Sequence, residues 1–196
     1  NGIQVFSVGF IEGAQHVAEE LGVNYDFYAK YDAGFADSAT GSSTAGTYYG
    51  EGANVVFACA GSVGDGVTAK AKEEGKLAVQ VDANKDDQQP GYVLTSVIKN
   101  TEVVVKTLTE NLVEGNLNDT ERTQVYDLGS GATSITDLAT ISKYIQDTDE
   151  AQAKWTEIKD YITDLSEQIS NGEIKVTNMQ MGDSFDAAKC PNISIQ

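Results

Sequence analysis

The stretch from Asn54 to Lys99 constrains the fold more than any other part of the chain. An apolar run, VVFA, breaks at Gly61, a segment of helical composition ends at Gly75, and a second apolar run, LAVQV, breaks at Asp82. This order of strand, glycine turn, helix and strand predicts a β-α-β unit, which builds a parallel sheet through a right-handed crossover. Parallel sheets bind ligands outside the carboxyl ends of their strands. Gly61 and Asp82 are predicted to lie at two such ends.

The composition limits the classes of protein that fit. The chain has 196 residues, of which 40% are hydrophobic, which is enough for one substantial core or for one lobe plus part of another. Thirteen basic and 30 acidic residues give a formal net charge of −17, which argues against nucleic acid and anionic membrane surfaces as partners, since both require a basic patch. No apolar run approaches the roughly 20 residues of a membrane span. Cys59 and Cys190, the only cysteines, predict neither a disulfide nor a metal site.

Hydrophobic periodicity extends the prediction to the rest of the chain. Apolar residues recur at helical spacing from residue 6 to residue 21, and Gly22 follows as a stop signal. Residues 24–31 alternate and are rich in aromatics, which indicates a strand that ends in a turn. Residues 37–50 are rich in Ser, Thr and Gly, so helix propensity alone predicts a loop. The further expected elements are strands over residues 91–99 and 124–128, helices over residues 101–114 and about 149–170, and an irregular polar tail from Thr177 without a core face.

Two of the expected helices carry a clear apolar stripe. Val104, Leu108 and Leu112 share one face of residues 101–114, and Trp155 and Ile162 share one face of the last helix. A glycine follows each of these segments, which is a common helix terminator. Both segments are therefore predicted to be amphipathic helices.

Several short motifs, spread over nearly the whole chain, carry a resemblance to a known family. They are FxxAG ending at Gly61, VD ending at Asp82, PGxVLTSxxK ending at Lys99, VGFIEGA, AGFAD and GEIKV. In this combination the chain resembles the basic membrane protein family, the substrate-binding lipoproteins of bacterial nucleoside importers. The resemblance also implies a helix over residues 37–50, against propensity.

The resemblance implies an α/β fold, a three-layer αβα arrangement with a largely parallel sheet, as in one lobe of a type I periplasmic binding protein. Residues 1–100 would form the carboxyl-terminal ligand-binding lobe, residues 101–176 a helix, strand and helix that cross between lobes and close the fold, and residues 177–196 a tail. Members of the family begin with a further lobe that carries a D-x-G-x-x-D-x-S-F-N stretch. Nothing in this sequence matches that stretch, so we expect a fragment or a chain without its first half.

The resemblance also implies a function. It predicts capture of a nucleoside, with purines favoured, and delivery to an ABC permease from a lipid-anchored position on the extracellular face of the membrane. No cofactor is implied, and the missing lobe or self-association would cover the remaining wall of the site. The alternatives are a regulatory or interaction protein of the same family and a sugar-binding protein of the same fold. An enzyme is least favoured, because the single histidine, His16, has no G-x-S-x-G motif or metal cluster to act with.

Phe35 and Gly61 are two of the four expected ligand-binding residues. Phe35 follows a glycine in a predicted turn, where an aromatic ring can stack on a flat ligand ring, and the alternative is packing between loops or lobes. The resemblance favours stacking on the base. Gly61 begins the turn after a strand, and its missing side chain would let a ligand approach the backbone. The GSVGDG segment matches neither phosphate-loop pattern.

Asp82 and Lys99 are the other two expected ligand-binding residues. Asp82 ends an apolar strand, and its two oxygens suit a pair of vicinal sugar hydroxyls, although it can also be a turn residue in an acidic loop. Lys99 ends the next strand, where a lysine is ordinarily only solvated. The resemblance implies that Lys99 contacts the ligand's sugar beside Asp82.

Overall fold

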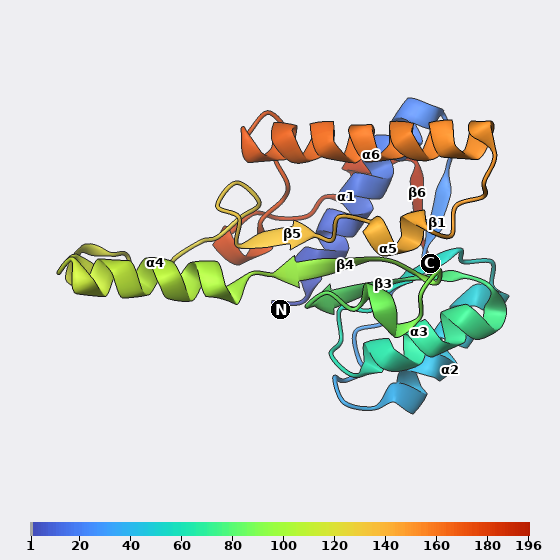
Figure 1. Ribbon diagram of the computed structural model, residues 1–196, viewed down its shortest axis with the longest axis horizontal. Coiled ribbons are helices and arrows are strands. Elements are labelled where there is room, and N and C mark those ends of the chain that lie inside the picture. Colours follow the sequence, from blue (N-terminus) through green and yellow to red (C-terminus); the bar gives the residue numbers. More distant parts are fainter. Residues whose placement is uncertain (1) are drawn as a thin grey trace.

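The computed structural model describes residues 2–196 and has a mixed α/β architecture built on a four-stranded sheet (Figure 1). The sheet has the order β2-β3-β4-β5, with β2 (Val55–Phe57), β3 (Leu77–Asp82) and β4 (Val93–Lys99) parallel and β5 (Thr133–Ile135) antiparallel to β4. The predicted β-α-β unit is confirmed, because β2 leads through α3 (Val63–Glu74) into β3. The carboxyl ends of β2, β3 and β4 therefore share one edge.

Helices cover both faces of this sheet (Figure 1). On one face, α2 (Ser38–Gly50) and α3 pack on each other and on the sheet, around the buried Ala45, Tyr49 and Val67. On the other face lie α5 (Ala139–Ser142) and α6 (Asp149–Ser170), whose core contains Ile141 and Trp155. The expected three-layer αβα arrangement is thus present.

Helix α2 forms where propensity alone predicts a loop. The Asp37 side chain accepts a hydrogen bond from the backbone N–H of Ala39 at 3.0 Å and so caps the helix. Gly41 of α2 and Gly66 of α3 allow the two helices to approach closely, because a Cβ at Gly66 would overlap the Ser38 carbonyl oxygen. Tertiary packing of small residues therefore overrides the weak helix propensity, as the family resemblance predicts.

The end of the chain is ordered, which contradicts the prediction of an irregular tail without a core face. Strand β6 (Ile193–Ile195) pairs in parallel with β1 (Tyr25–Phe27) in a second, two-stranded sheet. Ile193 and Cys190 are buried against α1 (Gln4–Leu21), the predicted helix that Gly22 ends in a left-handed conformation. The prediction for the tail was wrong because the tail contains few apolar residues that would indicate a buried face. Strand β1 is also shorter than the predicted strand over residues 24–31.

Both cysteines are free, and they lie in different parts of the fold. Cys190, which the sequence places in a polar tail, is buried beside α1. Cys59 is only partly buried, at the end of β2. The structure therefore holds no bond between them.

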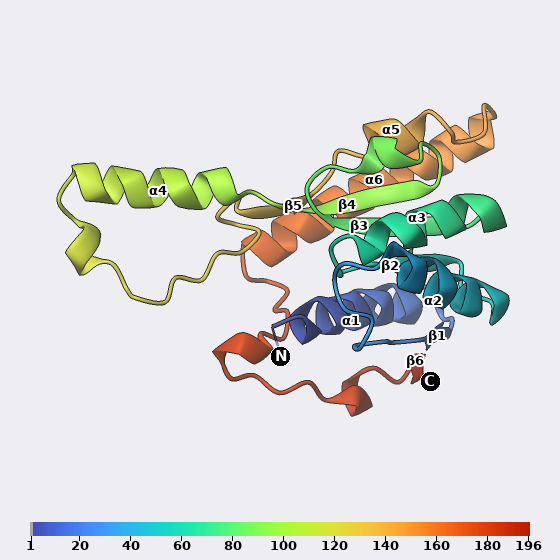
Figure 2. The same cartoon turned by 90° about the horizontal axis from the view of Figure 1, so that it is seen from below.

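Helix α4 (Thr101–Val113) projects from the body of the molecule (Figure 2), and none of its side chains is buried. The chain returns from it to β5 along residues 114–132. The predicted strand over residues 124–128 is wrong. Asp127 and Ser130 instead exchange hydrogen bonds in a turn, the Ser130 N–H donating to Asp127 Oδ1 at 2.9 Å and the Asp127 N–H to Ser130 Oγ at 3.1 Å. This turn satisfies polar groups that a strand would have offered to a sheet. The remaining short elements are 3₁₀ turns at Asp86–Gln88, Leu117–Asp119, Met179–Met181 and Ala187–Lys189.

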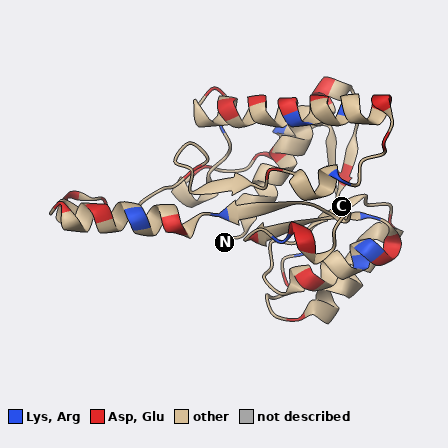
Figure 3. Ribbon diagram, viewed as in Figure 1, with Lys and Arg blue, Asp and Glu red and all other residues tan. Residues whose placement is uncertain are grey.

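Acidic positions are spread over most of the helices, and Lys and Arg positions do not gather on one element (Figure 3). Across residues 2–196, none of the helices is both long enough and apolar enough to cross a membrane.

Candidate ligand-binding site

Asp82 and Lys99 meet at the carboxyl edge of the sheet. Asp82 ends β3 and Lys99 ends the neighbouring strand β4, where Asp82 pairs in register with Ile98. The Lys99 Nζ lies 2.6 Å from Asp82 Oδ1, and both side chains are about half exposed. An ion pair with this exposure contributes only about 0–1 kcal/mol to stability. Its charged groups remain open to a ligand that lies against this edge.

The backbone of Asp82 is in an unusual conformation. Its φ is 80°, in the left-handed region that favours glycine, and only one other non-glycine residue of the described chain has a positive φ. Aspartate is one of the few residues other than glycine that adopt this conformation, because its short polar side chain can hydrogen-bond locally. The conformation sets the direction in which the Asp82 carboxylate leaves the end of β3.

A buried network supports the loop that follows Asp82. Ser96, which is fully buried on β4, donates from Oγ to Asp86 Oδ1 at 2.7 Å and accepts from the Lys85 N–H at 3.0 Å. Asp86 is also buried, so its carboxylate holds the loop against the sheet. The buried residues of β4 are Val93 and Ser96. The pairing of β3 with β4 has a register irregularity at Ala78/Val79.

An aromatic residue from α1 lies beneath the lysine. The Lys99 Nζ is 5.3 Å from the centroid of the Phe6 ring, within the range of a cation–π contact. Phe6 also packs edge-on against Phe57 at the end of β2, with ring centroids 6.5 Å apart. The start of α1 therefore adjoins the same edge. Sequence reasoning placed Phe6 only on the apolar face of a helix, and its helical spacing gave no sign of this role.

The backbone at Phe35 packs against the turn that contains Gly61. The Phe35 carbonyl accepts a hydrogen bond from the Ser62 N–H at 2.8 Å, which holds the Phe35 loop on the start of α3. Gly61 has a φ of 54°, and a Cβ there would lie 2.7 Å from the same carbonyl oxygen. The fold itself therefore requires glycine at this position. The Phe35 side chain is 60% exposed, so its ring is available for stacking.

Asp82 and Lys99 lie close enough to Cys59, just beyond the end of β2, to act on the pKa of its thiol. Burial raises the pKa of its thiol to about 11, while Lys99 lowers that pKa and Asp82 raises it. Because the thiol stays protonated at neutral pH, it is not an activated nucleophile. Within residues 2–196 there is also no group of three His, Cys, Asp or Glu side chains that could hold a metal ion. The site offers a carboxylate, an ammonium group and aromatic faces, which suit recognition by hydrogen bonds and stacking.

Comparison with known proteins places the chain in a family. The model of the family described as ABC transporter substrate-binding protein, PnrA-like, matches residues 1–180. BmpA of Lactococcus lactis, named an ABC transporter nucleoside-binding protein, is 32% identical in an alignment of 127 positions that covers 56% of this chain and 35% of that protein. Basic membrane protein D of Borreliella burgdorferi is 26% identical over 176 residues, which are 89% of this chain and 48% of that protein.

The fold has a counterpart among solved structures. The crystal structure of an ABC transporter solute-binding protein from Aeropyrum pernix aligns with a TM-score of 0.67 and 21% identity, over 87% of this chain and 52% of that one. The fold is thus that of part of a solute-binding protein. The chain belongs to the PnrA-like family of ABC transporter substrate-binding proteins, which are binding proteins and not enzymes. It spans about half the length, or less, of these relatives.

Proposed function

We propose that this chain carries one wall of a nucleoside-binding site in the substrate-binding component of an ABC importer. The observation that supports the proposal most is the Asp82–Lys99 pair at the carboxyl ends of two neighbouring strands, with its groups half exposed and Asp82 held in a left-handed backbone conformation. A carboxylate beside an ammonium group can accept from and donate to vicinal hydroxyls. A ribose offers such hydroxyls.

The base would be held by stacking. The exposed Phe35 ring follows a loop that is fixed to the start of α3, so it is a preformed aromatic platform. Stacking of a base on an aromatic side chain contributes about 1–3 kcal/mol. The name of the Lactococcus lactis relative supports a nucleoside as the ligand. Phe35 would thus contact the base, Asp82 and Lys99 the ribose, and the Gly61 backbone would allow close approach.

The partners follow from the same proposal. A substrate-binding protein delivers its ligand to an ABC permease, and a lipid anchor would keep it at the extracellular face of the membrane. In this class of fold two lobes close on the ligand, so a second wall would add to the affinity. We expect this chain by itself to bind nucleosides weakly.

Isothermal titration calorimetry with nucleosides, free bases and pentoses tests the proposal. Binding of nucleosides but not of pentoses is expected. Asp82→Ala should abolish detectable nucleoside binding by this chain, because losing two hydrogen bonds to a charged group, which contribute about 1.5–3 kcal/mol each, removes most of the affinity of a weak complex. The matched control is Asp119→Ala, which removes the same charge from an exposed 3₁₀ turn.

Two outcomes would contradict the assignment. Nucleoside binding that Asp82→Ala leaves intact would remove Asp82 from the site. Binding of pentoses with the same affinity as nucleosides would favour a sugar-binding protein and leave Phe35 without a ligand.

A further inference from the structure

Two neighbouring strands of the sheet each place a polar side chain in the core. Gln80 of β3 and Ser96 of β4 pair in register, and both are fully buried. The other buried residues of these two strands are apolar, namely Ala78, Val79, Val81 and Val93. Apolar side chains at both positions would fill the same space without burying polar atoms, a change that is often neutral or stabilising. The stability of the core therefore does not explain this polar pair.

Ser96 anchors the loop that follows Asp82. Its hydroxyl donates to Asp86 Oδ1 at 2.7 Å and accepts from the Lys85 N–H at 3.0 Å. Asp86 is only 2% exposed, and its own N–H donates to Asn84 Oδ1 at 3.1 Å. Hydrogen bonds to a carboxylate are among the strong ones in proteins. Residues 84–86 are thus fixed to β4, beginning two residues after Asp82.

Gln80 is a second anchor of the same loop. Its Nε2 donates to Gln88 Oε1 at 3.1 Å, and Gln88 Nε2 donates in turn to Asp65 Oδ1 of α3 at 3.1 Å. Gln80 Nε2 also donates to the Gly64 carbonyl at 2.9 Å and to the Thr68 hydroxyl. Gln80 Oε1, however, has no partner, and no other buried side-chain nitrogen or oxygen in residues 2–196 lacks one. A buried acceptor without a partner is destabilising, so the fold keeps this glutamine at a cost.

The anchored loop determines the backbone conformation of Asp82. Aspartate adopts both negative and positive φ, so the residue type alone does not select the observed φ of 80°. The ion pair with Lys99 is half exposed, and such a pair is too weak to select it. The chain has to pass from the end of β3 to the anchor at Asn84 within two residues, and the positive φ at Asp82 is part of that path.

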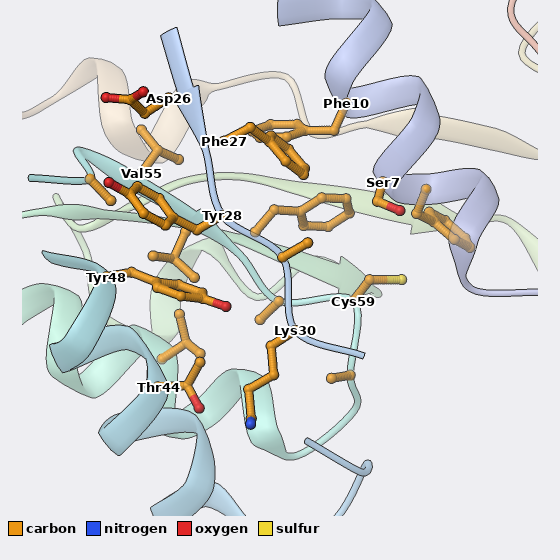
Figure 4. Close-up of a pocket in the computed structure, with 18 of the residues that line it drawn as sticks. Ser7, Phe10, Asp26, Phe27, Tyr28, Lys30, Thr44, Tyr48, Val55 and Cys59 are labelled. Atoms are coloured by element: carbon orange, nitrogen blue, oxygen red, sulfur yellow. The ribbon is translucent and has the colours of Figure 1, made fainter. Parts of the chain in front are cut away.

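The cavity on the other side of the site does not hold this loop. It has a volume of about 670 Å³ and lies between β1 and β2, with Cys59, Phe10 and Tyr48 among its lining residues (Figure 4). All of the residues that line it belong to the range 3–67, except Ile193. The loop after Asp82 contributes none of them, so its conformation depends on its anchors in the sheet.

We propose that Ser96, Asp86 and Gln80 are positioning residues for ligand binding, which fix the loop from Asn84 to Gln88 and thereby orient the Asp82 carboxylate toward the ligand. Their role in binding rests on the proposed function, whereas their effect on the conformation of Asp82 does not. A carboxylate that is already oriented loses less affinity to ordering when a ligand binds. Loss of an anchor should therefore weaken recognition of the vicinal hydroxyls and leave stacking of the base unchanged.

NMR of the chain without ligand tests the positioning itself. The variants are Asp86→Ala and Gln80→Met, and the readouts are backbone ¹⁵N order parameters of residues 82–88 and the couplings that report the φ of Asp82. We expect order parameters below about 0.6 in both variants, against about 0.85 for a rigid backbone. Asp86→Asn keeps an acceptor for the Ser96 hydroxyl and should retain the parent values. Asp87→Ala is the matched control, because it removes an exposed carboxylate from the same turn.

Thermal unfolding separates positioning from a structural role. Gln80→Met removes the anchor and the unpaired oxygen and keeps a side chain of similar size, so its melting temperature should equal or exceed that of the parent. A decrease of more than about 5 °C would overturn the proposal, because it would assign the glutamine to the stability of the core.

NMR titration with adenosine and with 2′,3′-dideoxyadenosine, which lacks the vicinal hydroxyls, tests the role in binding. Asp86→Ala and Gln80→Met should raise the Kd of adenosine at least about fivefold and that of the dideoxy compound less than about twofold. Equal losses for the two compounds would overturn the proposal, as would a loop that stays rigid in both variants. If the parent binds neither compound, the proposed function fails, and the measurements without ligand alone decide whether these residues position Asp82.

Discussion

Helices α4 and α6 are both amphipathic in sequence, but a residue of the apolar stripe is buried only in α6. Both show an apolar stripe at helical spacing, and both form over the predicted residues. In α6, Trp155 is only 8% exposed and packs on α5 and the sheet, whereas in α4 Leu112 is 61% exposed and no side chain is buried. An amphipathic pattern therefore predicts a helix and identifies the face to be covered. It does not identify what covers that face.

Helix α2 is the reverse case. Its composition gives almost no apolar stripe, yet it packs closely on α3 because glycines replace side chains at the crossing point. Small residues allow close backbone approach, and many dispersion contacts then replace a few large apolar ones. Burial in this molecule thus follows from the available partner more than from the hydrophobicity of the helix.

The largest expected effect in this comparison is at Trp155. Trp155→Ala should lower the free energy of unfolding by about 4 kcal/mol, because it leaves a cavity between α6 and the sheet. Urea unfolding followed by far-ultraviolet circular dichroism measures the loss. Trp155→Phe is the control, since it retains most of the apolar volume and loses the 2.7 Å bond from Nε1 to Ser142 Oγ, at a cost of about 1 kcal/mol. Equal losses for the two variants would show that packing does not hold α6.

Gly66→Ala should destabilise the protein by about 3 kcal/mol, because its Cβ would overlap the Ser38 carbonyl and force α2 and α3 apart. Gly13→Ala is the matched control within α1, where a Cβ meets nothing within 4 Å. It should stabilise by up to about 1 kcal/mol through helix propensity. Both changes can be measured by guanidinium unfolding. A neutral Gly66→Ala would mean that the α2–α3 contact is looser than the structure shows.

The cap of α2 should make stability depend on pH. The Thr40 hydroxyl first, and then the Ala39 N–H, lower the pKa of Asp37 below its ordinary value of 3.8. A carboxyl group with a lowered pKa stabilises the fold above the ordinary value, and this contribution is lost as the pH falls through the folded-state pKa. Asp37→Ala should therefore reduce the melting temperature at pH 7, and the difference from the parent should shrink toward pH 3. Asp37→Asn keeps the cap without the titration, so its difference from Asp37→Ala should not vary with pH.

The smallest effect is expected on α4. Leu112→Gln should change the free energy of unfolding of this chain by less than about 0.5 kcal/mol, since the side chain is exposed. Urea unfolding of the parent protein and of the Leu112→Gln variant measures this difference in the free energy of unfolding. A loss of more than 1 kcal/mol would show that α4 packs on the body in solution and would remove the contrast with α6.

The strand ends that form the candidate site could be predicted from the sequence. Asp82 and Lys99 each terminate an apolar run, and parallel pairing brings such ends to one edge. Phe6 could not be found in this way, because its contact with Lys99 depends on where α1 lies relative to the sheet. The buried hydrogen bond between Ser96 and Asp86 could not be predicted for the same reason, because a serine in an apolar strand does not indicate its partner.

The sequence by itself determined the β-α-β unit, the helix ends at Gly22 and Gly172, the long helix α6 and the acidic surface, because local propensity and hydrophobic period act within a few residues. Only the tertiary structure decided that α2 is a helix, that the chain's end pairs with β1, and that α4 stands free. Each of these depends on a contact between residues far apart in the chain, or on the lack of one.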